Sequence, residues 1–293
     1  RLKSFRLIGT LRHAKSQNPT LVRASPRSSY AEMLRAIRTR LEFLLKRKDK
    51  MVICVTSTES GDGKTFLSTN LAALYSMTGK KTLLIDLDLR KPNIHTKLGL
   101  ENGMGMSNYL IGDCEIEDIL MTNTPFGFDL MRAGTIPPNP GELIRSDKLT
   151  ELLSILRERY DYVVIDSSPV GLVPDALALI EQTDITLFVI RCMETDKRFA
   201  QQTLQNLSLN HKDKINLILS DIMVNKSGGS YGYGYGYGYG YGYGYGYGYG
   251  NGGAYNKYGK YGKYGKYAGY YRSKLGKKTT DAPHQYIDDS DED

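Results

Sequence analysis

The sequence predicts an α/β fold, a doubly wound and mainly parallel sheet with helices on both faces. Short and nearly continuous apolar runs alternate with helical patterns, and such runs are typical of strands that are covered on both faces. Regular alternation of this kind favours a parallel sheet. The expected strands are MVICVTS (51–57), KTLLIDLD (81–88), FDLM (128–131), DYVVIDSS (161–168), ITLFVIR (185–191) and INLILSDI (215–222).

Helical patterns separate these runs. FLSTNLAALYSMTG follows the first run and ends at Gly79, and SDKLTELLSILRERY precedes the fourth. An earlier stretch, YAEMLRAIRTRLEFLLKR, carries an apolar stripe at helical spacing, which predicts a helix face packed on the domain. The stripe consists of Leu34, Ile37, Leu41, Leu44 and Leu45. In open parallel sheets ligands bind at the carboxyl ends of the strands, so the functional residues are expected there.

Charge and composition divide the chain into three parts. Residues 1–50 carry a net charge of +11, residues 51–226 carry −6, and the tail from 227 carries +2. We therefore expect a basic arm (1–28), an α/β domain (29–226) and a Tyr/Gly/Lys-rich tail (227–293). By charge alone the arm is suited to nucleic acid or, next to a membrane, to anionic lipid. The tail holds 18 of the 23 tyrosines, many alternating with glycine, and such a segment is expected to be disordered.

Cysteine usage and hydropathy exclude some protein classes. Cys54, Cys114 and Cys192 are far apart without metal-ligand spacing, so we interpret them as small core residues in a reducing compartment. No run of about 18 apolar residues is present to span a membrane. The chain opens on Arg1 rather than Met, which suggests a fragment of a longer protein.

A phosphate-binding loop follows the first expected strand. In TSTESGDGKTF, Gly61 and Gly63 allow backbone N–H groups to turn toward an anion, Lys64 supplies a positive charge, and Thr65 can ligate Mg²⁺. The strict pattern has glycine where Thr58 stands, but a strand precedes the loop and a helix follows it. The alternative, a chance glycine turn, is disfavoured by that context. The expected ATP-binding residues are Ser60, Gly61, Asp62, Gly63, Lys64, Thr65 and Phe66.

Aspartates end two further strands. Asp86 and Asp88 close LLIDLD on one side of the sheet, and Asp166 closes VVID. Each alone is often an N-cap or a turn former, but three beside a GKT loop predict a Mg²⁺ site with one carboxylate to spare. We expect Thr65, Asp88 and Asp166 to hold the metal and its water shell. Lys64 would neutralise phosphate charge, and Asp86 would act as the base.

Together, these motifs resemble Walker A, Walker A′ and Walker B of the bacterial tyrosine kinases (BY-kinases). EMLRAIR (Glu32, Arg35, Arg38) resembles that family's ExxRxxR oligomerisation motif, and AGTIPPNPGELI and PVGLVPDA resemble two of its loops. The resemblance implies a protein-tyrosine autokinase that uses ATP and Mg²⁺ and regulates capsule or exopolysaccharide polymerisation and export. It also implies a ring of identical subunits, by resemblance an octamer, at the cytoplasmic face of the inner membrane. The implied partners are a membrane-spanning portion of the same co-polymerase and a tyrosine phosphatase, without nucleic acid.

The tyrosine-rich tail favours a kinase over the other functions that the sequence allows. Partitioning and division-site ATPases share the fold, but they carry a signature lysine where this chain has Glu59, and they have no tyrosine tail. An adhesive or inert tail would not need an ATP site. Adenine recognition is the open point, because Ser220 stands where related strands often end in Asn. Tyrosines beside an ATP site are best interpreted as phosphoacceptors; those expected are Tyr255, Tyr258, Tyr261, Tyr264, Tyr267, Tyr270 and Tyr271.

Overall fold

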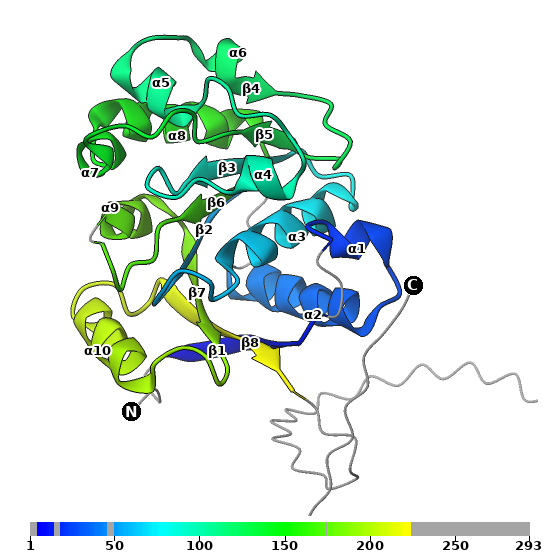
Figure 1. The fold of residues 1–293 in the computed structure, drawn as a ribbon. Helices are drawn as coiled ribbons and strands as arrows, with labels where there is room; N and C mark the ends of the chain where they lie inside the picture. The colour runs from blue at the N-terminus through cyan, green and yellow to red at the C-terminus, as the bar shows by residue number, and fades with distance from the viewer. Residues whose placement is uncertain (1–4, 15–17, 46–49, 174, 224–293) are drawn as a thin grey trace, which may run out of the picture. The chain divides into compact units, whose positions relative to one another are not determined.

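The computed structural model describes residues 5–14, 18–45, 50–173 and 175–223 (Figure 1). Within these residues one sheet of eight strands has the order β1-β8-β7-β2-β6-β3-β5-β4. Neighbouring strands are parallel except for β4 and β5. The strands are β1 (Arg6–Arg12), β2 (Met51–Ser57), β3 (Thr82–Leu87), β4 (Leu120–Met121), β5 (Asp129–Met131), β6 (Tyr162–Ser167), β7 (Ile185–Arg191) and β8 (Ile215–Ile222).

Helices cover both faces of the sheet (Figure 1). The helices are α1 (Leu21–Ala24), α2 (Ser29–Leu44), α3 (Lys64–Ser76), α4 (Ile94–Lys97), α5 (Met106–Ile111), α6 (Ile116–Ile119), α7 (Pro140–Ile144), α8 (Asp147–Arg159), α9 (Asp175–Gln182) and α10 (Lys197–Ser208). Alternate residues of each strand point to opposite faces. Accordingly, Ile53 and Val55 of β2 pack with α2 and α3, whereas Val52 and Cys54 pack with α8 and α9.

The predicted fold class is confirmed. All six expected strands are present, with ends within one residue of the expected positions. Each contains a short apolar run, and most of these apolar side chains are buried. The predicted stripe of α2 faces the core: Leu34, Ile37 and Leu41 are fully buried, and Leu44 and Leu45 pack against them. The tyrosine-rich tail lies outside the described residues.

The basic arm contains a strand that the sequence analysis did not predict. Residues 6–12, RLIGTLR, form β1, which pairs in parallel with β8 at one edge of the sheet. Only Ile8, Gly9 and Leu11 are buried, so the apolar signal is short and ends in exposed arginines. The sheet therefore begins within the segment assigned to the arm.

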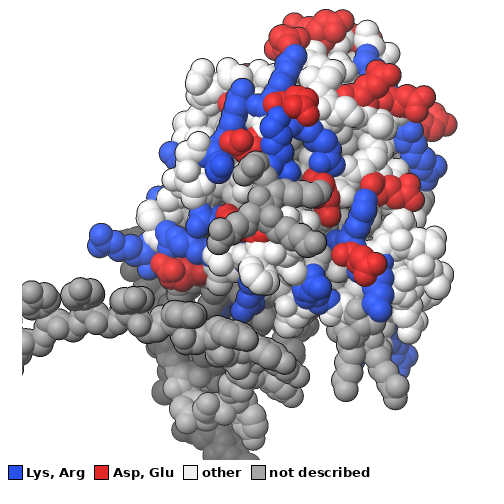
Figure 2. Space-filling model, turned by 180° about the vertical axis from the view of Figure 1, so that it is seen from behind, with Lys and Arg blue, Asp and Glu red and all other residues white. Residues whose placement is uncertain are grey.

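The three cysteines differ in burial. Cys54 is in the core, as expected, whereas Cys114 and Cys192 are only half-buried, and all three are free thiols. No helix in the described part of the chain has the length and apolar character needed to cross a bilayer. On the face shown in Figure 2, Lys and Arg side chains are interspersed with Asp and Glu, so the described residues present no broad field of one sign there.

Candidate nucleotide and phosphoryl-transfer site

The loop between β2 and α3 has the backbone of an anion-binding loop. Gly61 and Gly63 have φ angles of +98° and +100°, which glycine adopts without strain. Gly63 is the N-cap of α3 and contributes no side chain, so the first N–H groups of the helix stay free for an anion. A 13-residue helix with an open N-terminus at a strand end is suited to hold phosphate.

Side chains of the loop divide into two groups. Lys64 and Thr65 begin α3, and Lys64 is 94% buried, with 6% of its surface exposed. Asp62 is also buried, but its carboxylate belongs to the loop itself: it accepts hydrogen bonds from the Glu59 N–H at 3.0 Å and from Thr195 Oγ1 at 2.8 Å. Asp62 therefore shapes the loop, while Lys64 and Thr65 remain to meet the ligand.

The three predicted aspartates converge beside this loop. Asp86 of β3 lies opposite Asp166 of β6 in the parallel register, and Asp88 follows two residues after Asp86. The β6 strand is itself paired with β2, which carries the loop. All three carboxylates are buried, and Thr65 Oγ1 donates to Asp166 Oδ2 at 2.6 Å. The order of the strands thus brings the phosphate loop and the three aspartates, which are far apart in the sequence, to one site.

Each carboxylate has a different environment. Both oxygens of Asp86 accept backbone N–H bonds, from Asp88 at 3.2 Å and from Asn93 and Ile94 at 3.3 and 3.2 Å. Asp88 Oδ1 accepts from Ser168 Oγ at 2.9 Å. Asp166 Oδ1 is buried without a hydrogen-bond partner. Asp86 is therefore held by backbone, whereas Asp166 retains an unused acceptor beside Thr65.

Burial and mutual repulsion shift the proton affinities of two of these groups. Burial, then the charge of Asp166, raises the pKa of Asp86 well above its ordinary value, although backbone N–H bonds oppose the shift. Burial likewise raises the pKa of Asp166 to about 6, even with Lys64 and the Thr65 hydroxyl favouring its ionised form. Without a counter-cation, the cluster binds protons more tightly than ordinary aspartates do.

Two hollows meet at the phosphate loop. The first hollow is lined by Ser60, Lys64, Thr65, Asp88, Arg90 and Lys91 among others. The second hollow lies on the β8 side of α3 and is lined by His13, Tyr30, Arg191, Ser220 and Asp221 among others. Gly61, Gly63 and Phe66 line both. An extended ligand with its anionic part at Gly63 and Lys64 can therefore occupy both hollows.

Further charged residues are engaged in ion pairs within the chain. Arg90 pairs with the buried Asp175 at the start of α9, with Nη2–Oδ2 at 2.8 Å, so it is not a free solvated cation. On α2, Arg35 pairs with Glu32 at 2.5 Å and Arg38 with Glu42 at 3.5 Å, all within one chain. The predicted phosphoacceptor tyrosines lie outside the described residues.

Sequence reasoning missed the polar residues of the second hollow. His13 and Asp221 are 208 residues apart in the sequence but in hydrogen-bond contact. Arg191 ends β7 and donates from Nε to Asp221 Oδ2 at 2.8 Å. The sequence did contain a signal for two of these residues. Arg191 ends one apolar strand and Asp221 lies near the end of the next, and ligands bind at the carboxyl ends of parallel strands. No sequence signal pointed to their partner His13, which follows β1.

Comparisons with known proteins agree with this site. A family model described as an AAA domain matches residues 50–219. Tyrosine-protein kinase YwqD of Bacillus subtilis is 33% identical over 223 residues, 75% of this chain and 94% of YwqD. The chain belongs to the bacterial tyrosine-protein kinases. Tyrosine-protein kinase wzc of Salmonella typhi is 35% identical over 220 residues, which are 75% of this chain but only 30% of wzc.

Solved structures support the same family. The kinase domain of Escherichia coli tyrosine kinase ETK has a TM-score of 0.70 and 28% identity, covering 80% of this chain and 96% of that one. The BceF tyrosine kinase domain has a TM-score of 0.67 and 30% identity, covering 75% and 94%. The resemblance seen in the sequence is therefore confirmed. The chain is a tyrosine kinase with a nucleotide-binding loop, and it corresponds to a minor part of wzc in length.

The residues of this tyrosine kinase fit a magnesium ion. Asp166 Oδ1 is a buried oxygen without a partner, next to a hydroxyl and close to Asp88, and hard cations prefer such oxygens. Within the described part of the chain, no three His, Cys, Asp or Glu side chains are placed to bind a metal by themselves. The ion would thus need Thr65, water and nucleotide oxygens in addition to carboxylates, as Mg²⁺ commonly does.

The raised pKa values predict how the stability of the ligand-free kinase depends on pH. Above pH 3.8 the unfolded carboxyls lose protons that folded Asp86 and Asp166 still bind, so the free energy of unfolding falls as pH rises toward the folded pKa values. From about pH 5 to 8 the fall should be on the order of 1–3 kcal/mol. It should be smaller in Asp86→Asn, which removes one of these carboxyls.

Urea denaturation without Mg²⁺ or nucleotide measures this difference. Asp213→Asn is the matched control, because Asp213 is an exposed carboxyl in the loop before β8. The control should keep the pH dependence of the wild type. Parallel curves for wild type and Asp86→Asn would contradict the assignment of bound protons to this cluster.

Proposed function

We propose that this tyrosine kinase transfers the γ-phosphate of ATP to tyrosines of its own C-terminal tail. The observation that carries the proposal is the convergence of Asp86, Asp88 and Asp166 on Lys64 and Thr65 in a chain that ends in a tyrosine-rich segment. A nucleotide site adjoining buried carboxylates can bind a metal, withdraw a proton and stabilise a phosphoryl group. The tail supplies tyrosine hydroxyls as acceptors.

The loop and its lysine would bind the phosphates. Backbone N–H groups from Gly61 to Thr65 and the amine of Lys64 would face the β- and γ-phosphates. Thr65, Asp88 and Asp166 would hold Mg²⁺ and its water shell, which supplies positive charge to the phosphate oxygens when bound. Lys64 would stabilise the negative charge that develops during transfer. Burial of Lys64 makes this interaction stronger than it would be in water.

Asp86 is proposed as the base. A tyrosine hydroxyl has a pKa of about 10, so transfer at neutral pH benefits from a carboxylate that accepts its proton. The raised pKa of Asp86 favours that role. Asp88, however, lines the first hollow, while Asp86 lies behind it and is bonded to backbone. Comparing variants of the two residues therefore decides the assignment.

Transfer between subunits is consistent with the length of the tail. A flexible chain of about 45 residues has a root-mean-square span of roughly 35–40 Å. A domain of about 200 residues has a radius of gyration near 16–17 Å, hence a similar diameter. The tail is long enough to reach the site of an adjacent subunit. We propose transfer in trans within a ring, by resemblance an octamer.

Assembly and location are proposed from the family. Exposed Glu32 and half-buried Arg35 and Arg38 would exchange their intrachain partners for a neighbouring subunit, which a repeated contact can extend into a closed ring. The ring would lie at the cytoplasmic face of the inner membrane, joined to a membrane-spanning portion and opposed by a phosphatase. It would regulate capsule or exopolysaccharide export. The relatives favour this kinase over a partitioning-type ATPase switch.

The first functional prediction separates the carboxylates. Asp86→Asn should abolish phosphotyrosine in the tail, at least about 100-fold, while keeping most nucleotide affinity, because the metal-holding groups remain. Asp88→Asn and Asp166→Asn should weaken Mg-nucleotide binding itself. Calorimetry with Mg-ADP and a phosphotyrosine blot of purified protein measure the two effects.

Lys64→Met is the inactive reference, and Asp213→Asn is the matched charge control that should behave as wild type. A fully labelled tail in Asp86→Asn would refute Asp86 as base. If Asp88→Asn instead binds nucleotide normally and loses labelling, the base is Asp88. Phosphate release by wild type without any phosphotyrosine would support the ATPase alternative.

A second functional prediction concerns the direction of transfer. When full-length Lys64→Met protein is mixed with active protein truncated after residue 226, the inactive chain should become labelled, because only its tail carries the acceptors. Changing Glu32, Arg35 and Arg38 to Ala in both chains should reduce labelling and lower the mass seen by light scattering. An unlabelled mixture, beside strong labelling of intact wild type, would contradict transfer in trans.

A further inference from the structure

The second hollow is built partly by residues outside the family match. The matched segment covers residues 50–219. His13 and Tyr30 on one side of that segment, and Ser220 and Asp221 on the other, all line the hollow. One part of its wall therefore comes from segments that the family model does not match.

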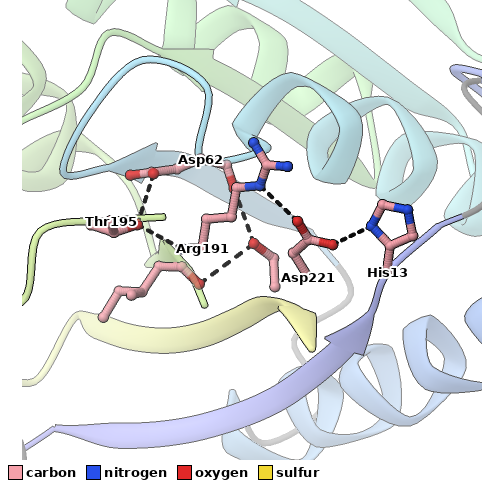
Figure 3. Close-up of polar contacts among 7 residues, drawn as sticks. His13, Asp62, Arg191, Thr195 and Asp221 are labelled. Atoms are coloured by element: carbon pink, nitrogen blue, oxygen red, sulfur yellow. Dashed lines mark hydrogen bonds and ion pairs between the residues drawn. The ribbon is translucent and has the colours of Figure 1, made fainter. Parts of the chain in front are cut away.

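A chain of polar contacts runs from β1 to the phosphate loop through this hollow (Figure 3). His13 Nδ1 hydrogen-bonds Asp221 Oδ1, and Arg191 Nε donates to Asp221 Oδ2 at 2.8 Å. The Arg191 backbone N–H donates to Thr195 Oγ1 at 2.8 Å. Thr195 Oγ1 in turn donates to Asp62 Oδ1 at 2.8 Å, so every link is a direct contact.

A second connection runs in parallel. Ser220 Oγ donates to the backbone carbonyl of Asp62 at 3.0 Å. Ser220 immediately precedes Asp221. Two consecutive residues of β8 therefore contact the phosphate loop, through Ser220, and the His13 and Arg191 side chains, through Asp221. Ser220, which replaces the Asn often found there, therefore supports the loop.

Backbone strain is concentrated around the hollow. Among the described residues other than glycine, positive φ angles occur at Asn123, Met193 and Asp221. Two of these are in this region: Asp221 lines the hollow at +61°, and Met193 lies at +69° in the turn between Arg191 and Thr195. Such conformations persist when surrounding contacts enforce them and are frequent at ligand sites. The contacts of His13 and Arg191 hold Asp221 in this conformation.

The strand that precedes His13, β1, packs closely against α2. At Gly9, an added Cβ would lie 2.3 Å from Ile37 Cγ1 of α2, so only glycine permits this approach. The Arg12 N–H points to Met33 Sδ at 3.4 Å, and the His13 N–H donates to the Ile222 carbonyl at 3.2 Å. Both contacts fix the backbone beside His13.

The position of the hollow indicates its ligand. Phosphates held at Gly63 and Lys64 leave the nucleoside of ATP to extend into one of the two hollows, and the first is lined by Asp88 and Lys64. The second offers the aromatic rings of Tyr30 and Phe66, 5.3 Å apart, and the partly exposed guanidinium of Arg191. Aromatic and guanidinium groups suit a heterocyclic base.

We propose that His13 is a positioning residue for nucleotide binding, which holds the Asp221–Arg191 wall of the nucleoside hollow and, through Thr195, the Asp62 side of the phosphate loop. The inference rests on the proposed ATP site. It gives the N-terminal segment a role in nucleotide binding without contact with the transferred phosphate. Displacing β1 from β8 would lower nucleotide affinity.

The test compares His13→Ala with His13→Asn in the full chain. The alanine variant should raise the Kd for Mg-ADP and the KM for ATP about 3- to 10-fold and keep kcat within about twofold, since binding is altered and chemistry is not. Asn places an amide donor near the position of Nδ1 and should restore much of the affinity. Arg6→Ala, an exposed change elsewhere on β1, is the matched control and should bind as wild type.

A double-mutant cycle with Thr195→Val tests the connection. If His13 acts through Thr195, the two substitutions affect the same contact. The Kd for Mg-ADP of the double variant should then rise clearly less than the product of the fold-increases caused by His13→Ala and Thr195→Val alone. If the fold-increases in Kd simply multiply, His13 does not act through the phosphate loop. If wild type and His13→Ala bind Mg-ADP with equal affinity, His13 has no positioning role. An equal loss in His13→Asn would show a merely structural effect. Absence of Mg-ADP binding by wild type would instead refute the proposed function.

Discussion

Three buried aspartates at adjacent strand ends repel one another, and the rest of the site is arranged around that repulsion. The parallel register sets Asp86 opposite Asp166, and Asp88 is two residues further along. Lys64 and the Thr65 hydroxyl offset part of the charge, but the pKa of Asp166 still rises to about 6. A divalent cation relieves this repulsion better than a proton does, because it coordinates several oxygens at once. Under the proposed function, binding of Mg-nucleotide would relieve this repulsion.

The same constraint connects fold and chemistry. β2 lies between β6 and β7, so the phosphate loop adjoins Asp166 on one side and Arg191 on the other. The carboxylate side is suited to phosphoryl transfer and the Arg191 side to the nucleoside. In the proposed reaction, the two ends of one nucleotide would contact two separate sets of side chains. The tyrosine acceptor would then enter from the carboxylate side.

Much of this was predictable because its signals are local. Unbroken apolar runs defined six strands, and GKT after the first placed the loop. Contacts between distant segments were not predictable. β1 shows few apolar residues and depends on Gly9 fitting against Ile37, and the pairing of His13 with Asp221 spans 208 residues. Sequence also could not show that Asp86 is bonded to backbone whereas Asp88 lines the first hollow, because both follow the same alternation.

The central claim is that these carboxylates exchange bound protons for Mg²⁺ when nucleotide binds. Calorimetric titration with ADP already saturated with Mg²⁺, at about pH 6 in buffers of different ionisation enthalpy, measures the protons exchanged. The account predicts net release of protons by the wild type, because coordination lowers the pKa of a ligating group. It predicts a smaller release by Asp166→Asn at concentrations that still saturate that variant. Binding without any proton release, or with uptake, would contradict it.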